Sequence, residues 1–243
     1  MSGYSVLPVT GIPELRAGDD LAALILERIE LQDADVVVVA QKAVSKVEGR
    51  VVHLEDIEPS ARAKEIAGHD TDPRRIEAIL REALRVVRVR PPLVICETQH
   101  GFICASAGVD GSNAPEPEML VLLPLDPDAS AVRLRDALHE RTGCDVGVIV
   151  TDSFGRPWRQ GTTDVAIGAA GVEVLRDLQG GRDPVGYELH ATVIAVADEI
   201  AGAAQLVSGK LDRIPVTIVR GLDVRGEGRA TDISVPPERD LFR

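Results

Sequence analysis

Apolar runs alternate with polar segments along most of the chain, and this alternation predicts a succession of strands and helices. Residues 36–39 are four consecutive valines, a pattern typical of a strand buried on both faces. The other expected strands lie at residues 4–9, 93–97, 102–105, 119–125, 146–150, 192–197 and 216–219. The pattern therefore predicts an α/β protein.

Helix signals lie between these strands. The expected helices span residues 21–30, 73–87, 130–142 and 198–207, with a short helix after residue 60. The residues expected to begin or end them are Asp19 or Asp20, Ser60, Asp72 with Pro73, and Gly143. Residues 154–171 are so rich in Gly, Thr and Arg that we expect no regular core element there. We find no internal boundary and treat residues 1–243 as one unit.

Composition narrows the class of protein. Only 2% of the residues are aromatic whereas 44% are hydrophobic, so the core must consist of Val, Leu, Ile and Ala. The formal charge of -12 argues against nucleic-acid binding, which needs a basic surface. The three cysteines, Cys96, Cys104 and Cys144, have no metal-type spacing and indicate a reducing compartment. Neither a leader nor a long apolar run is found, so we expect a cytoplasmic protein without membrane contact.

Asp110 lies in the first loop that is dense enough in Gly, Asp and Asn to form a site. Its carboxylate is a hard oxygen ligand, and the neighbouring glycines would let backbone N–H groups approach a phosphate. The alternative is an Asx turn, because these residue types favour turns for purely local reasons.

Asp152 and Ser153 follow the apolar residues 146–150, so a rigid strand would present a carboxylate and a hydroxyl at the edge of the sheet. Such a pair suits Mg²⁺ or Mn²⁺. Asp110 and Asp152 together would be a sufficient protein contribution to such an ion, since substrate phosphates supply further ligands. The alternative is that Asp152 only caps a turn.

Arg156 and Arg159 flank Trp158, the only tryptophan of the chain, a few residues beyond these candidate ligands. Guanidinium groups bind phosphate or carboxylate oxygens in pairs, and an indole can cover a planar ring. A salt-bridged arginine pair beside a core tryptophan explains the same residues nearly as well.

Lys42, Lys46 and the segment 208–210 are candidate phosphate contacts, although neither region matches a Walker A loop, and lysines are usually just solvated. The chain also lacks GxGxxG, HExxH and GxSxG motifs, which leaves dinucleotide, zinc-protease and serine-hydrolase functions with little support. The residues by themselves indicate an α/β enzyme that binds metal and phosphate.

Two strings, residues 107–113 (AGVDGSN) and residues 151–161 (TDSFGRPWRQG), resemble the paired signature of the F420-0:gamma-glutamyl ligases in both order and spacing. Residues 11–14 (GIPE), 42–46 (KAVSK) and 196–201 (VADEIA) extend the resemblance over nearly the whole chain. It implies the family's own mixed α/β (α+β) fold, the CofE-like fold with mixed sheets and flanking helices.

The resemblance also implies roles for individual residues. Asp110 and Asp152 would bind one Mg²⁺ or Mn²⁺, Ser153 would help to bind a second, and Asp110, Asp152 and Lys46 would be catalytic. GTP would contact Gly11, Ile12, Pro13, Glu14, Gln41, Lys46, Asn113, Ser208, Gly209 and Lys210, within a stretch that continues to residue 215. Some relatives have an acidic metal ligand where this chain has Lys210.

By the same resemblance, GTP would activate the carboxylate of coenzyme F420-0 as an acyl phosphate, which the amine of L-glutamate would attack. A homodimer and a K⁺ requirement are further expectations from the family. Two other functions would use the same residues: a metal-dependent phosphohydrolase with water as nucleophile, and a nucleotide-sensing module that forms no product.

Overall fold

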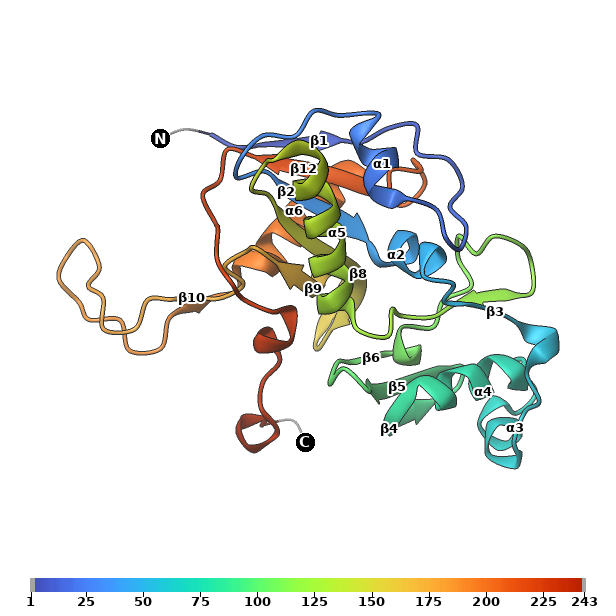
Figure 1. Ribbon diagram of the computed structural model, residues 1–243. Coiled ribbons are helices and arrows are strands. Elements are labelled where there is room, and N and C mark those ends of the chain that lie inside the picture. Colours follow the sequence, from blue (N-terminus) through green and yellow to red (C-terminus); the bar gives the residue numbers. More distant parts are fainter. Residues whose placement is uncertain (1–2, 242–243) are drawn as a thin grey trace.

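A five-stranded sheet forms the centre of the protein in the computed structural model, which describes residues 3–241 (Figure 1). Residues 1–2 and 242–243, which belong to the unit expected from the sequence, lie outside the described residues. The strand order is β1 (Ser5–Pro8), β12 (Val216–Arg220), β2 (Val36–Ala40), β8 (Gly147–Arg156) and β9 (Arg159–Ala170). β2 and β8 run parallel, and the other neighbouring strands are antiparallel.

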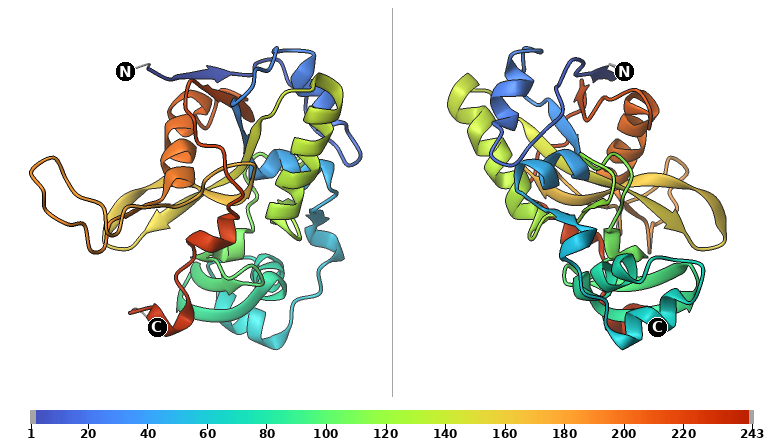
Figure 2. Two further views of the ribbon diagram at one scale, coloured as in Figure 1. Left: turned by 60° about the vertical axis from the view of Figure 1, so that its left-hand side comes forward. Right: turned by 90° about the vertical axis from the view of Figure 1, so that its right-hand side faces the viewer.

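Helices cover both faces of this sheet, and β2 explains why. Val37 and Val39 join a core cluster with α1 (Leu21–Leu26) and α5 (Pro127–Thr142), whereas Val36 and Val38 join one with α6 (Val196–Ser208). Alternate side chains of a strand point to opposite faces, so an unbroken valine run is buried twice. Figure 2 shows α5 and α6 on opposite sides of the sheet in both views. The expectation for residues 36–39 is confirmed.

A smaller three-stranded sheet lies beside the central one and packs against two helices. Its strands are β4 (Ala83–Arg90), β5 (Leu93–Thr98) and β6 (Ile103–Ala105), and the helices are α3 (Ala61–Ala67) and α4 (Pro73–Glu82). Ile76 and Ile79 of α4 meet Val94 and Cys96 of β5 in its core. The mixed α/β fold with flanking helices is thereby confirmed.

Short elements connect these two parts. α2 (Gln41–Val47) follows β2 directly, and β3 (Val51–His53) pairs with β7 (Met119–Val121).

β10 (Arg176–Asp177) and β11 (Val193–Ile194) form the base of an arm, residues 178–192, that projects from the molecule in Figure 1. The 3₁₀ turns are Leu54–Asp56, Ser106–Gly108, Ala230–Ile233 and Pro237–Arg239.

The predicted helix boundaries are confirmed where they rest on caps. Asp20, Ser60 and Asp72 accept hydrogen bonds from the backbone N–H groups of their helices, and Gly143 ends α5 with a left-handed φ of 74°. The predicted length of the first helix is wrong, because α1 stops at Leu26 instead of residue 30.

Three other sequence predictions are wrong in their extent. The helix begun at Pro73 ends at Glu82, because Val86 and Val89 pair with β5 as strand residues. The strand expected at residues 119–125 stops at Val121, and that at 192–197 contains only Val193–Ile194 before α6 begins.

Residues 154–171 were expected to be irregular, and this is also wrong. β8 continues to Arg156 and pairs with β9 along a long hairpin whose inner half is buried between α5 and α6. Gly168 of β9 lies so close to α5 that a Cβ there would stand 2.2 Å from the carbonyl oxygen of Pro127. Glycine in this strand therefore permits close packing instead of marking a loop.

No helix among residues 3–241 is long and apolar enough to span a membrane.

Candidate functional site

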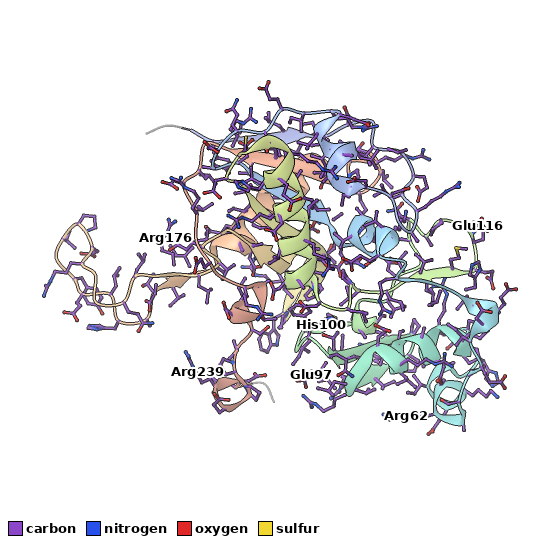
Figure 3. All side chains as sticks on the ribbon, in the orientation of Figure 1. Arg62, Glu97, His100, Glu116, Arg176 and Arg239 are labelled. Carbon is purple, nitrogen blue, oxygen red and sulfur yellow. The ribbon has the colours of Figure 1, made fainter. Side chains whose placement is uncertain are left out.

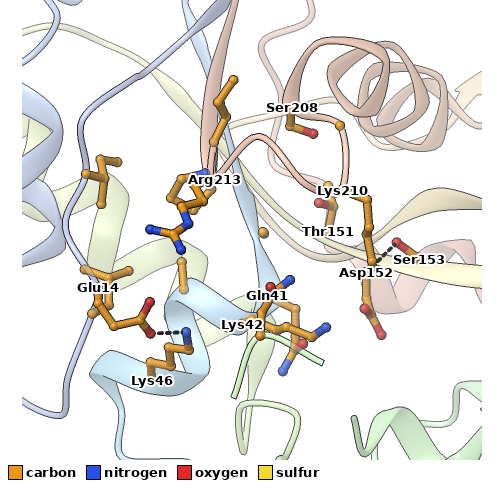
Figure 4. Close-up of a pocket in the computed structure, with 18 of the residues that line it drawn as sticks. Glu14, Gln41, Lys42, Lys46, Thr151, Asp152, Ser153, Ser208, Lys210 and Arg213 are labelled. Atoms are coloured by element: carbon orange, nitrogen blue, oxygen red, sulfur yellow. Dashed lines mark hydrogen bonds and ion pairs between the residues drawn. The ribbon is translucent and has the colours of Figure 1, made fainter. Parts of the chain in front are cut away.

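A cavity of about 830 Å³ lies where several loops meet the carboxyl ends of β2 and β8 (Figure 4). β2 ends at Ala40 directly opposite Thr151 of β8, so Gln41 and Asp152 follow side by side at one sheet edge. The loop before α1 and the loop after α6 close the sides. Carboxyl ends of parallel strands are where α/β sheets receive ligands.

Most residues proposed from the sequence lie around this cavity. Those that line it are Ile12, Pro13, Glu14, Gln41, Lys46, Asn113, Asp152, Ser153, Ser208, Gly209 and Lys210. Two proposed residues are not among the lining. Gly11 precedes the lining loop with a left-handed φ of 77°, and Asp110 lies behind Lys42, which does line it. The roles of all these residues stay predictions.

Lys46 forms one side of the cavity as a buried ammonium group on α2. Its Nζ donates to Oε1 of Glu14 across the cavity wall, and the Lys46 side chain is 9% exposed against 62% for Glu14. The ammonium group has three N–H donors, and the hydrogen bond to Glu14 uses one of them. Lys46 is therefore placed to bind another anion.

Gln41 is held rigidly at the start of α2. Its Nε2 donates to Ser45 Oγ at 2.7 Å and to the carbonyl oxygen of Leu122 at 2.8 Å. Both amide hydrogens are thereby used inside the protein, so Oε1 is the group that Gln41 can offer to a ligand.

Lys42 links the cavity to Asp110. Its Nζ donates to Asp110 Oδ2 at 2.5 Å and to Ser112 Oγ at 2.6 Å, and Ser112 Oγ donates to the same carboxylate at 2.7 Å. Burial alone would raise the pKa of Asp110, but the hydrogen bonds from Lys42 and Ser112 outweigh it and lower the pKa. Asp110 is therefore an ionised carboxylate that already has a cation.

The pKa of Asp152 is shifted in the opposite direction to that of Asp110. Burial raises its pKa to about 6, and the charge of Asp164 adds to the rise. The backbone N–H of Ser153 and the charges of Lys42 and Lys210 oppose this shift without cancelling it. The carboxylate end of β8 therefore carries negative charge that the surrounding protein does not fully compensate.

Asp164 is a site residue that the sequence analysis missed. It lies on β9 directly opposite Ser153, lines the cavity, and accepts hydrogen bonds from Ser153 Oγ at 2.7 Å and Thr151 Oγ1 at 3.2 Å. Its segment had been interpreted as irregular. The β-branched residues Thr162, Thr163, Val165 and Ile167 around it were the signal that could have revealed a strand.

Lys42 and Arg213 complete the cations at the cavity. The sequence indicated Lys42 only as a candidate phosphate contact. Its hydrogen bond to Asp110 is seen only in the folded structure. Arg213 lines the cavity from the loop after α6 and has a left-handed φ of 56°, and its guanidinium points inward in Figure 4.

The arginine and tryptophan cluster lies away from these residues. Arg156, Trp158 and Arg159 are at the tip of the β8–β9 hairpin and do not line the cavity. Trp158 is 84% exposed, and Arg156 donates to the carbonyl oxygen of Gln160 at 3.1 Å. The core-tryptophan interpretation is therefore wrong, and contact of these side chains with a ligand stays a prediction.

The donors at the cavity fit a hard divalent cation that takes only part of its ligands from protein. Among residues 3–241, no three His, Cys, Asp or Glu side chains form a complete ion-binding group. Asp152 and Asp164 instead stand beside the hydroxyl groups of Thr151 and Ser153. Mg²⁺ commonly binds one or two carboxylates and completes its shell with phosphate oxygens and water.

Comparisons with known proteins identify the family. The family model described as F420-0:Gamma-glutamyl ligase matches residues 11–221. A protein of Methanopyrus kandleri named Coenzyme F420:L-glutamate ligase is 48% identical over 253 residues, covering 100% of both chains. Proteins of the same name from Methanothermobacter thermautotrophicus (42% identical, 99% of each chain) and Archaeoglobus fulgidus (45%, 98% of this chain and 96% of the relative) are also similar. The chain belongs to the F420-0:gamma-glutamyl ligase family.

Proposed function

We propose that this chain joins L-glutamate to coenzyme F420-0 through an amide bond, using GTP and a divalent cation. The family supplies the ligase activity and its two substrates. The observation that supports the use of GTP and metal is the cavity itself, whose lining combines the lysines Lys42, Lys46 and Lys210 with the carboxylates of Asp152 and Asp164.

The nucleotide would lie between the loop before α1 and the loop after α6. Lys46 and Arg213 offer N–H donors from two sides of the cavity to a polyanion, in a protein whose formal charge is -12. Gln41 and Asn113 offer amide groups for its uncharged parts.

Asp152 would bind the divalent cation. Asp110 would bind the same cation once Lys42 exchanges its hydrogen bond to the Asp110 carboxylate for one to a phosphate oxygen. The bound cation would offset charge on the triphosphate and on the transferred phosphoryl group. Ser153 and Lys210 lie on the other side of Asp152, where the second ion expected from the family would bind.

The reaction balances without a side-chain nucleophile. The F420-0 carboxylate attacks the γ-phosphorus of GTP and releases GDP, which leaves an acyl phosphate. The amine of glutamate then attacks the acyl carbon, loses a proton and expels phosphate. Lys42, Lys46 and Arg213 stabilise the oxygens that carry charge in both steps, so catalysis depends on positioning and electrostatics.

Three further expectations belong to this proposal. The chain acts as a homodimer, requires K⁺ besides the divalent ion, and works in the cytoplasm, where GTP is available and the free Cys96, Cys104 and Cys144 remain reduced. Light scattering at several protein concentrations would test the dimer, and omission of K⁺ from the assay would test the monovalent ion.

Mass spectrometry of the product tests the central proposal. Purified chain is incubated with F420-0, L-glutamate, GTP and Mg²⁺, and F420-0 should gain the mass of one or more glutamate residues while GDP and phosphate appear. Absence of this product in the complete mixture, with folded protein, would refute the proposed function.

Phosphate release distinguishes the ligase from the phosphohydrolase. A ligase should release phosphate rapidly only when both F420-0 and glutamate are present, whereas a hydrolase should release it from GTP and metal alone. Tight GTP binding without product in any mixture would instead indicate a nucleotide-sensing module.

A further inference from the structure

Lysine is rare in this chain, and it is concentrated at the cavity. Only four of the 27 basic residues are lysines, namely Lys42, Lys46, Lys64 and Lys210. Three of them line the cavity, and Lys64 lies on α3 at a distance from it. Arginine supplies the other 23 basic residues; Arg213 lines the cavity, and others lie far apart on the molecule, as Arg62 and Arg176 do in Figure 3. An ammonium group is a compact point charge, whereas a guanidinium group is a wide plane, so these positions select compact cations.

Lys210 stands at the carboxylates of β8 and β9. Its Nζ donates to Ser153 Oγ at 3.3 Å, and Ser153 Oγ in turn donates to Asp164 Oδ1 at 2.7 Å. Figure 4 shows the Lys210 side chain beside Asp152. The ammonium group therefore contacts Ser153 directly and is linked to Asp164 through the Ser153 hydroxyl.

A divalent cation bound to the Ser153 hydroxyl would meet this ammonium group at close range. The lone pairs of Ser153 Oγ would have to serve both cations, and the two like charges would repel each other in a partly buried site. Asp152 and Asp164 together carry two negative charges, which one divalent ion and one ammonium group already outweigh. On the protein side, a second divalent ion would therefore share Ser153 Oγ with Lys210 and meet no uncompensated carboxylate, so that only the phosphates of the nucleotide would hold it.

We propose that the ammonium group of Lys210 takes the place of the second divalent cation, so that this chain binds one divalent ion per nucleotide. Asp152 holds that single ion, and Lys210 ties Ser153 and Asp164 together while it faces the phosphate oxygens of the nucleotide. This inference rests on the proposed function and specifies how its site is charged.

Counting bound Mn²⁺ tests the inference directly. The full chain is brought to equilibrium dialysis with Mn²⁺ and a hydrolysis-resistant GTP analogue, and the excess metal and nucleotide in the protein compartment are measured. The wild type should hold one Mn²⁺ per bound nucleotide. Two Mn²⁺ per nucleotide would overturn the inference, even if the ligase product forms.

Variants at Lys210 test whether its ammonium group limits the number of bound Mn²⁺ ions. Lys210→Glu removes the ammonium group and adds a carboxylate beside Ser153 and Asp164, so it should bind two Mn²⁺ per nucleotide. Lys64→Glu has the same change of charge outside the cavity and should still bind one. A Lys210→Glu variant that folds and still binds one Mn²⁺ would overturn the inference. Should it fail to fold, the neutral Lys210→Met serves instead and should show a second, weaker Mn²⁺ site.

The count also separates this inference from the proposed function. Nucleotide bound without any Mn²⁺ would refute metal dependence and the inference together. Two ions with normal product formation would refute only the inference.

Discussion

The two sides of the cavity differ in how their charges are balanced. On the side of α2, each lysine is already paired: Lys46 with Glu14, and Lys42 with Asp110 and Ser112. On the side of β8 and β9, burial and the charge of Asp164 raise the pKa of Asp152, and the charges of Lys42 and Lys210 offset only part of this rise. The lysines on the side of α2 can bind an anionic ligand, whereas the carboxylates on the side of β8 and β9 can bind a cation.

This difference indicates how a strongly acidic protein can bind a polyanion. The carboxylate partners of Lys42 and Lys46 offset part of the cost of burying these ammonium groups, and an incoming phosphate has only to replace a carboxylate partner. The unbalanced carboxylates attract a divalent ion that then serves the same phosphate.

Asp152→Asn should lower the rate of glutamate addition by at least about 100-fold, because the amide keeps the shape of the side chain but loses the charge that holds the ion. The rate is measured as glutamylated product per chain by mass spectrometry. Circular dichroism of the same sample serves as the control for folding. Wild-type turnover in the folded variant would show that Asp152 does not hold the metal.

The same substitution should stabilise the metal-free protein above neutral pH. The pKa of Asp152 is about 6 in the folded state against an ordinary value of 3.8, so its ionisation is disfavoured by folding. This penalty is absent below pH 4, grows as the pH rises to 6 and is complete above it. About two pKa units correspond to at most ~3 kcal/mol. Urea unfolding in EDTA at pH 5 and pH 8 measures it, and equal gains at both values would contradict the prediction.

Lys46→Ala should raise the KM for GTP about tenfold, which corresponds to ~1.4 kcal/mol, with a smaller effect on the KM for glutamate. The variant removes a buried cation that can exchange Glu14 for phosphate. GTP titrations at fixed Mg²⁺ and saturating F420-0 give the value. An effect confined to glutamate would place Lys46 at the other substrate.

Lys64→Ala should change little, because this lysine lies on α3, outside the cavity. We expect turnover within twofold of the wild type and a change in unfolding free energy of no more than ~0.5 kcal/mol. A loss of GTP affinity as large as that of Lys46→Ala would mean that any reduction of positive charge weakens binding, whatever its position.

Elements whose signals are local could be predicted from the amino-acid sequence. A polar cap followed by a helical pattern located the starts of α1, α3 and α4, and the valine run identified β2 as doubly buried. Two motifs with their spacing also sufficed to indicate the family, which the relatives confirm.

Features that depend on contact with a distant segment of the chain could not be predicted in this way. Val86 and Val89 became strand residues because β5 lies beside them, and residues 159–170 became a strand because β8 pairs with them. That pairing brought Asp164 opposite Ser153, and the return of the chain after α6 brought Lys210 there. The charge balance of the cavity therefore could not be predicted from the sequence, since it arises from distances between residues far apart in the chain.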